Sequence, residues 1–89
     1  MMVCKLVRYR GCVQGVSFRY TARRLAEGFP VAGYVRNLSS GEVELVAEGE
    51  SHDVQSFLDT IARQMTGYIQ EQTIREEPVH GMKGFSIRH

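Results

Sequence analysis

The sequence has no tryptophan, two prolines, two cysteines and no long apolar run. Cys4 and Cys12 form no CxxC and have no second pair and no nearby histidine, which excludes the usual zinc spacing and a redox dithiol. No apolar stretch approaches about 18 residues, and no secretory segment is recognisable. We therefore expect two ordinary thiols and no bound metal. The protein is expected in a reducing compartment, most simply the cytoplasm, without membrane association.

The chain also has no large excess of charge of either sign. Eleven basic and ten acidic residues leave a net charge of +1. A general nucleic-acid binder carries a strong positive field, so we expect no nucleic-acid partner and only a local cationic site. A length of 89 residues suits one domain and is too short for two. We predict a single domain over residues 1–89 and expect a monomer without a cofactor.

Two helices are predicted from apolar spacing. Residues 51–66 carry one apolar stripe, with Ser51 as N-cap and Gly67 as a stop. Residues 18–27 show the same period and end before Gly28 and Pro30. The apolar positions are Val54, Phe57, Leu58, Ile61, Ala62 and Met65 in the later helix, and Phe18, Ala22, Leu25 and Ala26 in the earlier one.

Extended segments surround these helices. Residues 31–38 and 42–48 are joined by a short Ser-Ser-Gly connection typical of a hairpin. In the second arm Val43, Leu45 and Ala47 alternate with glutamates, which predicts one buried and one solvated face. Residues 3–12, 68–76 and 84–88 are further strands, and residues 77–83 a connector. The order βαββαβ with a short final strand resembles the ferredoxin-like α+β sandwich, an antiparallel sheet with two helices on one face.

The segment 11–19, GCVQGVSFR, joins a strand to a helix through a glycine-bearing loop. Unpaired N–H groups at a helix start favour an anion, and Arg19 would add a charged fork there. On these residues alone, Arg19 is more commonly a solvated helix-start side chain, and Asn37 before a hairpin is ordinarily a turn residue. A bound anion would nevertheless offset the unfavourable placement of Arg19 and Arg23 near a helix N-terminus.

Two motifs in register resemble the acylphosphatase family. The patterns are GxVQGVxFR and, about 14 residues later, GxVxN. The hairpin sequence GEVELVAEG and the terminal FSIR also fit, so the resemblance covers nearly the whole chain. Tyr34 stands where many members have tryptophan. The matching residues are Gly11, Val13, Gln14, Gly15, Val16, Phe18 and Arg19, then Gly33, Val35 and Asn37.

This resemblance implies metal-free hydrolysis of acyl phosphates to a carboxylate and inorganic phosphate. Arg19 would bind the phosphate and Asn37 would position the attacking water. A carboxylate is a good leaving group, so neither a metal nor a covalent nucleophile is required. The residues expected to bind the substrate phosphate are Cys12, Val13, Gln14, Gly15, Val16, Ser17, Phe18 and Arg19.

Other interpretations fit parts of the pattern. A related domain within a larger maturation protein could bind phosphate without turnover, and a ferredoxin-like module could bind RNA on its open sheet face. Gln14 either holds the loop or faces water. Arg23 and Arg24 are expected to be solvated, with Arg23 able to pair with Glu27. We assign no chemistry to His52, His80 and His89, and Ser17 has no neighbouring base that would make it a nucleophile.

Overall fold

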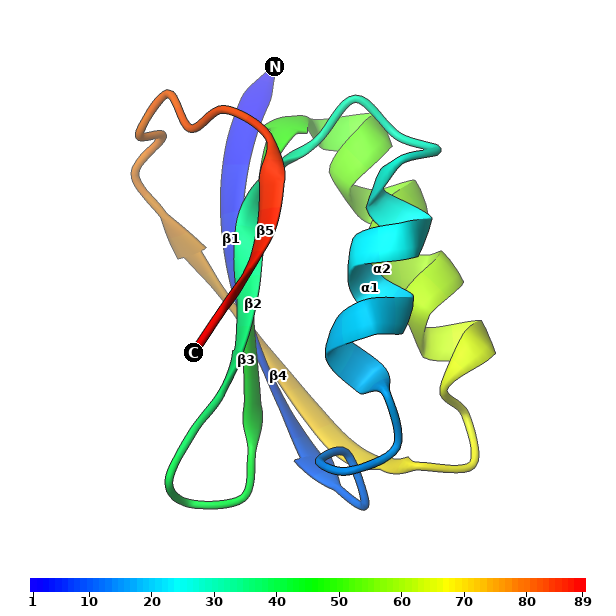
Figure 1. Ribbon diagram of the computed structural model, residues 1–89. Coiled ribbons are helices and arrows are strands. Elements are labelled where there is room, and N and C mark those ends of the chain that lie inside the picture. Colours follow the sequence, from blue (N-terminus) through cyan, green and yellow to red (C-terminus); the bar gives the residue numbers. More distant parts are fainter.

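Five strands and two helices follow one another in the predicted order (Figure 1). The computed structural model describes all residues 1–89. Neither helix is long and apolar enough to cross a membrane. The elements are β1 (Met2–Gly11), α1 (Phe18–Ala26), β2 (Ala32–Asn37), β3 (Val43–Glu50), α2 (Ser51–Gln64), β4 (Ile69–Glu77) and β5 (Phe85–Arg88).

The strands form one sheet in the order β4-β1-β3-β2-β5, and both helices cover the same face (Figure 1). The pairs β1–β3, β1–β4 and β2–β3 are antiparallel, which confirms the predicted α+β ferredoxin-like arrangement. The short strand β5 differs, because it pairs in parallel with β2. The sheet is therefore mixed, and β5 adds an edge beyond the core motif.

Aromatic side chains fill the layer between helices and sheet. The Phe57 ring of α2 is fully buried, with its centroid 5.8 Å from that of Phe29 and 5.4 Å from that of Phe85. At the start of α1, Phe18 packs on Tyr9 of β1 at 4.9 Å. Burial of one such ring contributes roughly 1.5–3 kcal/mol. The Phe18 contact therefore fixes where α1 begins relative to the end of β1.

Gly33 is required by the close approach of β2 to β3. Its φ is +147°, and a Cβ at this position would lie 1.8 Å from the carbonyl oxygen of Val46. Its N–H donates to the Gly84 carbonyl at 2.9 Å, so the same residue also begins the pairing with β5. The glycine of the GxVxN pattern is thus required by the packing of β2 against β3, independently of any catalytic role of the motif.

The solvated face predicted for residues 42–48 is wrong at two positions. Glu44 and Glu48 are only 4% and 3% exposed. Glu44 accepts hydrogen bonds from Arg36 Nε at 2.8 Å and Tyr34 Oη at 3.1 Å. Burial acts to raise the pKa of Glu44, but these hydrogen bonds hold it below its usual value. Period-two alternation predicts which face of the sheet a side chain points to. Side chains and loops of neighbouring elements decide whether a residue on that face is exposed to solvent.

The predicted capping of the second helix is also wrong. Glu50 is the N-cap residue and makes no side-chain capping bond, while helical geometry already begins at Ser51. The Ser51 N–H is satisfied by the Met1 carbonyl at 2.9 Å. The residue before β1, which lies beside the end of β3, thus supplies the acceptor in place of a local side-chain cap.

Glu48 holds the segment between β4 and β5. Its carboxylate accepts the backbone N–H groups of His80 at 2.5 Å and Met82 at 2.7 Å. These backbone hydrogen bonds, that from His80 first, lower the pKa of Glu48 below its usual value. The connector predicted at residues 77–83 is therefore anchored to the central strand by a buried charge.

We predict that Glu48→Gln destabilises the fold at neutral pH. A charge-assisted hydrogen bond contributes about 1.5–3 kcal/mol, and 1 kcal/mol shifts the melting temperature by roughly 4–8 °C in a domain of this size. Because the folded-state pKa is depressed, this contribution is present above the unfolded glutamate pKa of about 4.3 and is lost as pH falls below it.

Thermal unfolding followed by circular dichroism from about pH 7 to 3 tests this expectation. The difference in melting temperature between the wild type and Glu48→Gln should decrease as the pH falls towards 3. Glu27→Gln, which changes an exposed carboxylate without an ion pair, is the control. A melting temperature equal to that of the wild type at neutral pH would contradict the proposed anchoring.

Candidate functional site

The loop between β1 and α1 presents a run of unpaired backbone N–H groups. None of the amides from Val13 to Ser17 donates to a backbone carbonyl. The first amides of α1, at Phe18 and Arg19, have no acceptor within the helix because they lie in its first turn. Consecutive free amides at a helix N-terminus favour an anion.

Cys12 lies outside this run. Its N–H donates to the Tyr68 carbonyl at 2.9 Å, and its thiol is exposed. The amides free for an anion therefore start at Val13, one residue later than the set predicted from the sequence. The Cys12 amide instead joins the end of β1 to the residue that precedes β4.

The loop backbone takes unusual conformations at two positions. Gly15 has φ +79°, and Ser17, at φ +62° and ψ +25°, is the one non-glycine residue of the chain in the left-handed region. A Cβ at position 15 would meet nothing within 4 Å, so this glycine is needed for its φ rather than for space. Left-handed residues turn successive N–H groups towards one concave side, the arrangement of anion-binding nests.

A cavity of about 230 Å³ lies at this loop. It brings Arg19 together with Asn37, the last residue of β2, although 18 positions separate them in the sequence. Gln14 and Val16 do not line it, and Val16 instead packs against the core. The lining residues are Val13, Gly15, Ser17, Phe18, Arg19, Tyr20 and Asn37.

Arg19 keeps its charge available for a ligand. It forms no ion pair with a carboxylate, and its Nη1 lies 3.3 Å from Nδ1 of His89. The sequence analysis assigned His89 no chemistry. Only the pairing of β5 with β2 brings the end of the chain to this helix, and no local signal indicates it.

Gln14 ties the loop to the hairpin. Its side-chain Nε2 donates to the Leu38 carbonyl at 2.8 Å and to the Glu42 carbonyl at 2.9 Å. Of the two interpretations left open for Gln14, the structure supports the one in which it holds the loop. Leu38 directly follows Asn37, so the same side chain sets the distance between the two halves of the cavity.

The cavity is equipped to bind and orient rather than to exchange protons. No histidine, aspartate or glutamate lines it. The chain has no cluster of three or more His, Cys, Asp or Glu side chains that could hold a metal ion. A guanidinium, free amides, one carboxamide and the hydroxyl-bearing residues Ser17 and Tyr20 remain, which are groups that hold an anion and a polar neighbour. Tyr20 completes the lining, and no sequence motif points to it.

Comparisons with known proteins show which proteins the chain resembles in sequence and structure. The family model described as Acylphosphatase matches residues 5–87. An acylphosphatase of Methanospirillum hungatei is 41% identical over 80 residues, covering 88% of each chain. The structure of an acylphosphatase from Coxiella burnetii superposes with a TM-score of 0.86 at 32% identity, over 98% of this chain and 93% of that one. Full-length HypF in its phosphate- and nucleotide-bound form matches all of this chain with 12% of its own length, at 29% identity and a TM-score of 0.86.

We predict that Gln14→Leu weakens binding of inorganic phosphate at the loop by about three- to tenfold. Each lost neutral hydrogen bond is worth about 0.5–1.5 kcal/mol, and its loss frees the loop from the hairpin. A titration with phosphate followed at the backbone amides of Val13 to Ser17 by NMR measures the affinity. Gln64→Leu, at an exposed position of α2, is the control. Unchanged affinity in Gln14→Leu would rule out this positioning role.

Proposed function

We propose, since this chain belongs to the acylphosphatase family, that the cavity between the loop and Asn37 is where it hydrolyses acyl phosphates to a carboxylate and inorganic phosphate. One observation carries the proposal. A guanidinium without an ion pair, a run of free amides and a carboxamide from a different strand line the same cavity.

The loop and Arg19 form the phosphate half of this proposed site. The free amides from Val13 onward surround the phosphoryl oxygens, and the guanidinium donates charge-assisted hydrogen bonds to them. Such bonds contribute about 1.5–3 kcal/mol each. They strengthen as the phosphoryl group is transferred, so they act on the transition state as well as on binding.

Asn37 orients the nucleophile in this scheme. A carboxamide does not take up protons near neutrality, so it cannot serve as a base. Its Oδ1 accepts a hydrogen bond from a water molecule, which attacks phosphorus as the bond from phosphorus to the acyl oxygen breaks. One water proton passes to a phosphate oxygen of the substrate. The products are RCO₂⁻ and H₂PO₄⁻, so atoms and charge balance.

The leaving group removes the need for stronger catalysis. The conjugate acid of a carboxylate leaving group has a pKa of about 4, far below the pKa of an alcohol. Positioning of the water and stabilisation of charge on the phosphoryl oxygens are therefore sufficient for this reaction. Ordinary phosphate monoesters lack this advantage and should be poor substrates.

We also infer a monomer that works in the cytoplasm on small molecules rather than nucleic acid. The net charge of +1 gives no general attraction to a phosphate backbone. On the open sheet face, Tyr34 lies beneath the Arg88 guanidinium at 3.9 Å and beside the buried Glu44 carboxylate. Its ring is therefore not free to stack on a base.

We predict that Arg19→Gln and Asn37→Ala each lower kcat/KM for an acyl phosphate by roughly 10² to 10³-fold. Both positions lie at the surface of the cavity and outside the core, so the fold should be retained. Steady-state kinetics with benzoyl phosphate, accompanied by circular dichroism, measures both effects. Arg63→Gln on α2 is the matched control. Retained activity in either variant would refute the role given to that residue, and phosphate binding without any turnover in the wild type would favour a binding domain.

We further predict that the activity is unchanged by a chelator and that phosphate monoesters are hydrolysed poorly. The proposed reaction uses only side chains and amides of this chain. Assays of benzoyl phosphate and 4-nitrophenyl phosphate, each with and without EDTA, provide the measurement. Loss of benzoyl phosphate hydrolysis in EDTA, with recovery on adding a divalent cation, would show that the mechanism omits an essential metal.

A further inference from the structure

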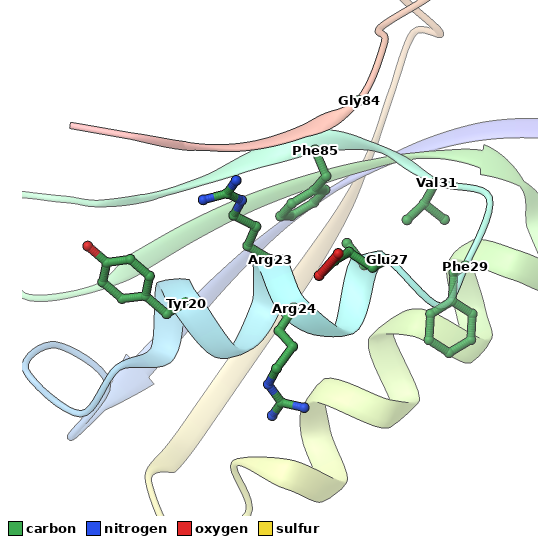
Figure 2. Close-up of a pocket in the computed structure, with 9 residues that line it drawn as sticks. Tyr20, Arg23, Arg24, Glu27, Phe29, Val31, Gly84 and Phe85 are labelled. Carbon is green, nitrogen blue, oxygen red and sulfur yellow. The ribbon is translucent and has the colours of Figure 1, made fainter.

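A second cavity adjoins the proposed site and is larger. It measures about 510 Å³ and lies between α1, the turn after it and the start of β5 (Figure 2). Both charged and aromatic side chains line it, and none of them belongs to the GxVQGVxFR or GxVxN motif. The lining residues are Tyr20, Arg23, Arg24, Ala26, Glu27, Phe29, Val31, Gly84 and Phe85.

Tyr20 connects the two cavities. Its side chain lines both of them and is 60% exposed. The smaller cavity, at about 230 Å³, is below the roughly 300–1,000 Å³ typical of small-molecule sites. Where the acyl part of a substrate extends beyond the small cavity, the larger cavity on the other side of Tyr20 can receive it.

The floor of the larger cavity is apolar and rigid. Phe29 and Phe85 are half-buried, and both rings pack on the fully buried Phe57. Aromatic rings held in this way offer a flat surface to a hydrocarbon or aromatic group without further ordering. The acyl part that fits here has an apolar portion next to the phosphate.

Arg23 adds an unpaired positive charge above that floor. It forms no ion pair, and the expected pairing with Glu27 is absent. Arg23 follows Arg19 by one helical turn, about 6 Å along the axis, on the same side of α1. Figure 2 shows its side chain extending towards Phe85, whereas Arg24 extends the opposite way from the helix.

We infer that the larger cavity binds the acyl part of the substrate and that Arg23 selects acyl phosphates carrying a second anionic group beyond an apolar spacer. This inference rests on the function proposed above. Two arginines one helical turn apart, each lining one of the adjoining cavities, suit a ligand with an anion at each end, and the aromatic floor suits an apolar spacer between them. Arg23 is thus a specificity-determining residue outside the two motifs.

Benzoyl phosphate and 4-carboxybenzoyl phosphate form a suitable substrate pair, because they differ only in a carboxylate across the ring. We expect the wild type to prefer the carboxylated substrate by about two- to fivefold in kcat/KM, the range of a partly exposed ion pair. The preference should appear mainly in KM, since the contact is equal in the ground and transition states. It should decrease at high ionic strength.

The variants Arg23→Gln and Arg63→Gln remove the same charge, one from the larger cavity and one from an exposed position of α2 outside both cavities. The ratio of the two kcat/KM values should fall to about one in Arg23→Gln and stay at the wild-type value in Arg63→Gln. Equal hydrolysis of both substrates by the wild type, or an unchanged ratio in Arg23→Gln, would overturn the assignment of Arg23 while leaving the proposed function intact. Failure of the wild type to hydrolyse either substrate would overturn both.

Discussion

The hydrogen bonds of one glutamine join the two halves of the candidate site. Gln14 belongs to the loop that carries the free amides, yet both of its acceptors lie in the hairpin that carries Asn37. A loop with left-handed residues at positions 15 and 17 has no regular hydrogen bonding of its own. Its shape must therefore be held from outside, and the hairpin carbonyls do this. The position of the free amides relative to Asn37 is consequently set by the same contact.

Much of the fold follows from local patterns in the sequence. Apolar spacing locates both helices to within two residues at each end, because each helix buries one continuous stripe. The hairpin is equally clear from its short turn. The errors concern residues whose environment is set at long range. Glu44 and Glu48 alternate like solvated residues, but cations from flanking strands and amides from a distant loop surround them. No local pattern contains those partners.

The residues of the candidate site also fall into those that the sequence identifies and those that it does not. The motifs identify Arg19, Asn37 and the loop, and both side chains line one cavity. They also suggest Cys12 as a ligand, whereas pairing of its amide with Tyr68 depends on how β4 meets β1. Tyr20 and His89 are not identified, because one is an ordinary helix residue and the other reaches the site only through β5. Residues that shape a site from neighbouring elements leave no periodic or spacing signal.

The two sides of the sheet are protected from pairing with another chain by different means, and Glu48 contributes to one of them. Along β4, exposed charged side chains such as Glu71, Arg75 and Glu76 discourage pairing with another chain. On the other side of the sheet, the edge of β2 that faces away from β3 is paired only with the four residues of β5. Since the connector to β5 is held by the Glu48 carboxylate, release of that strand would expose a bare edge. A single buried charge in the central strand is therefore linked, through the connector that it holds, to the strand that covers the far edge of β2.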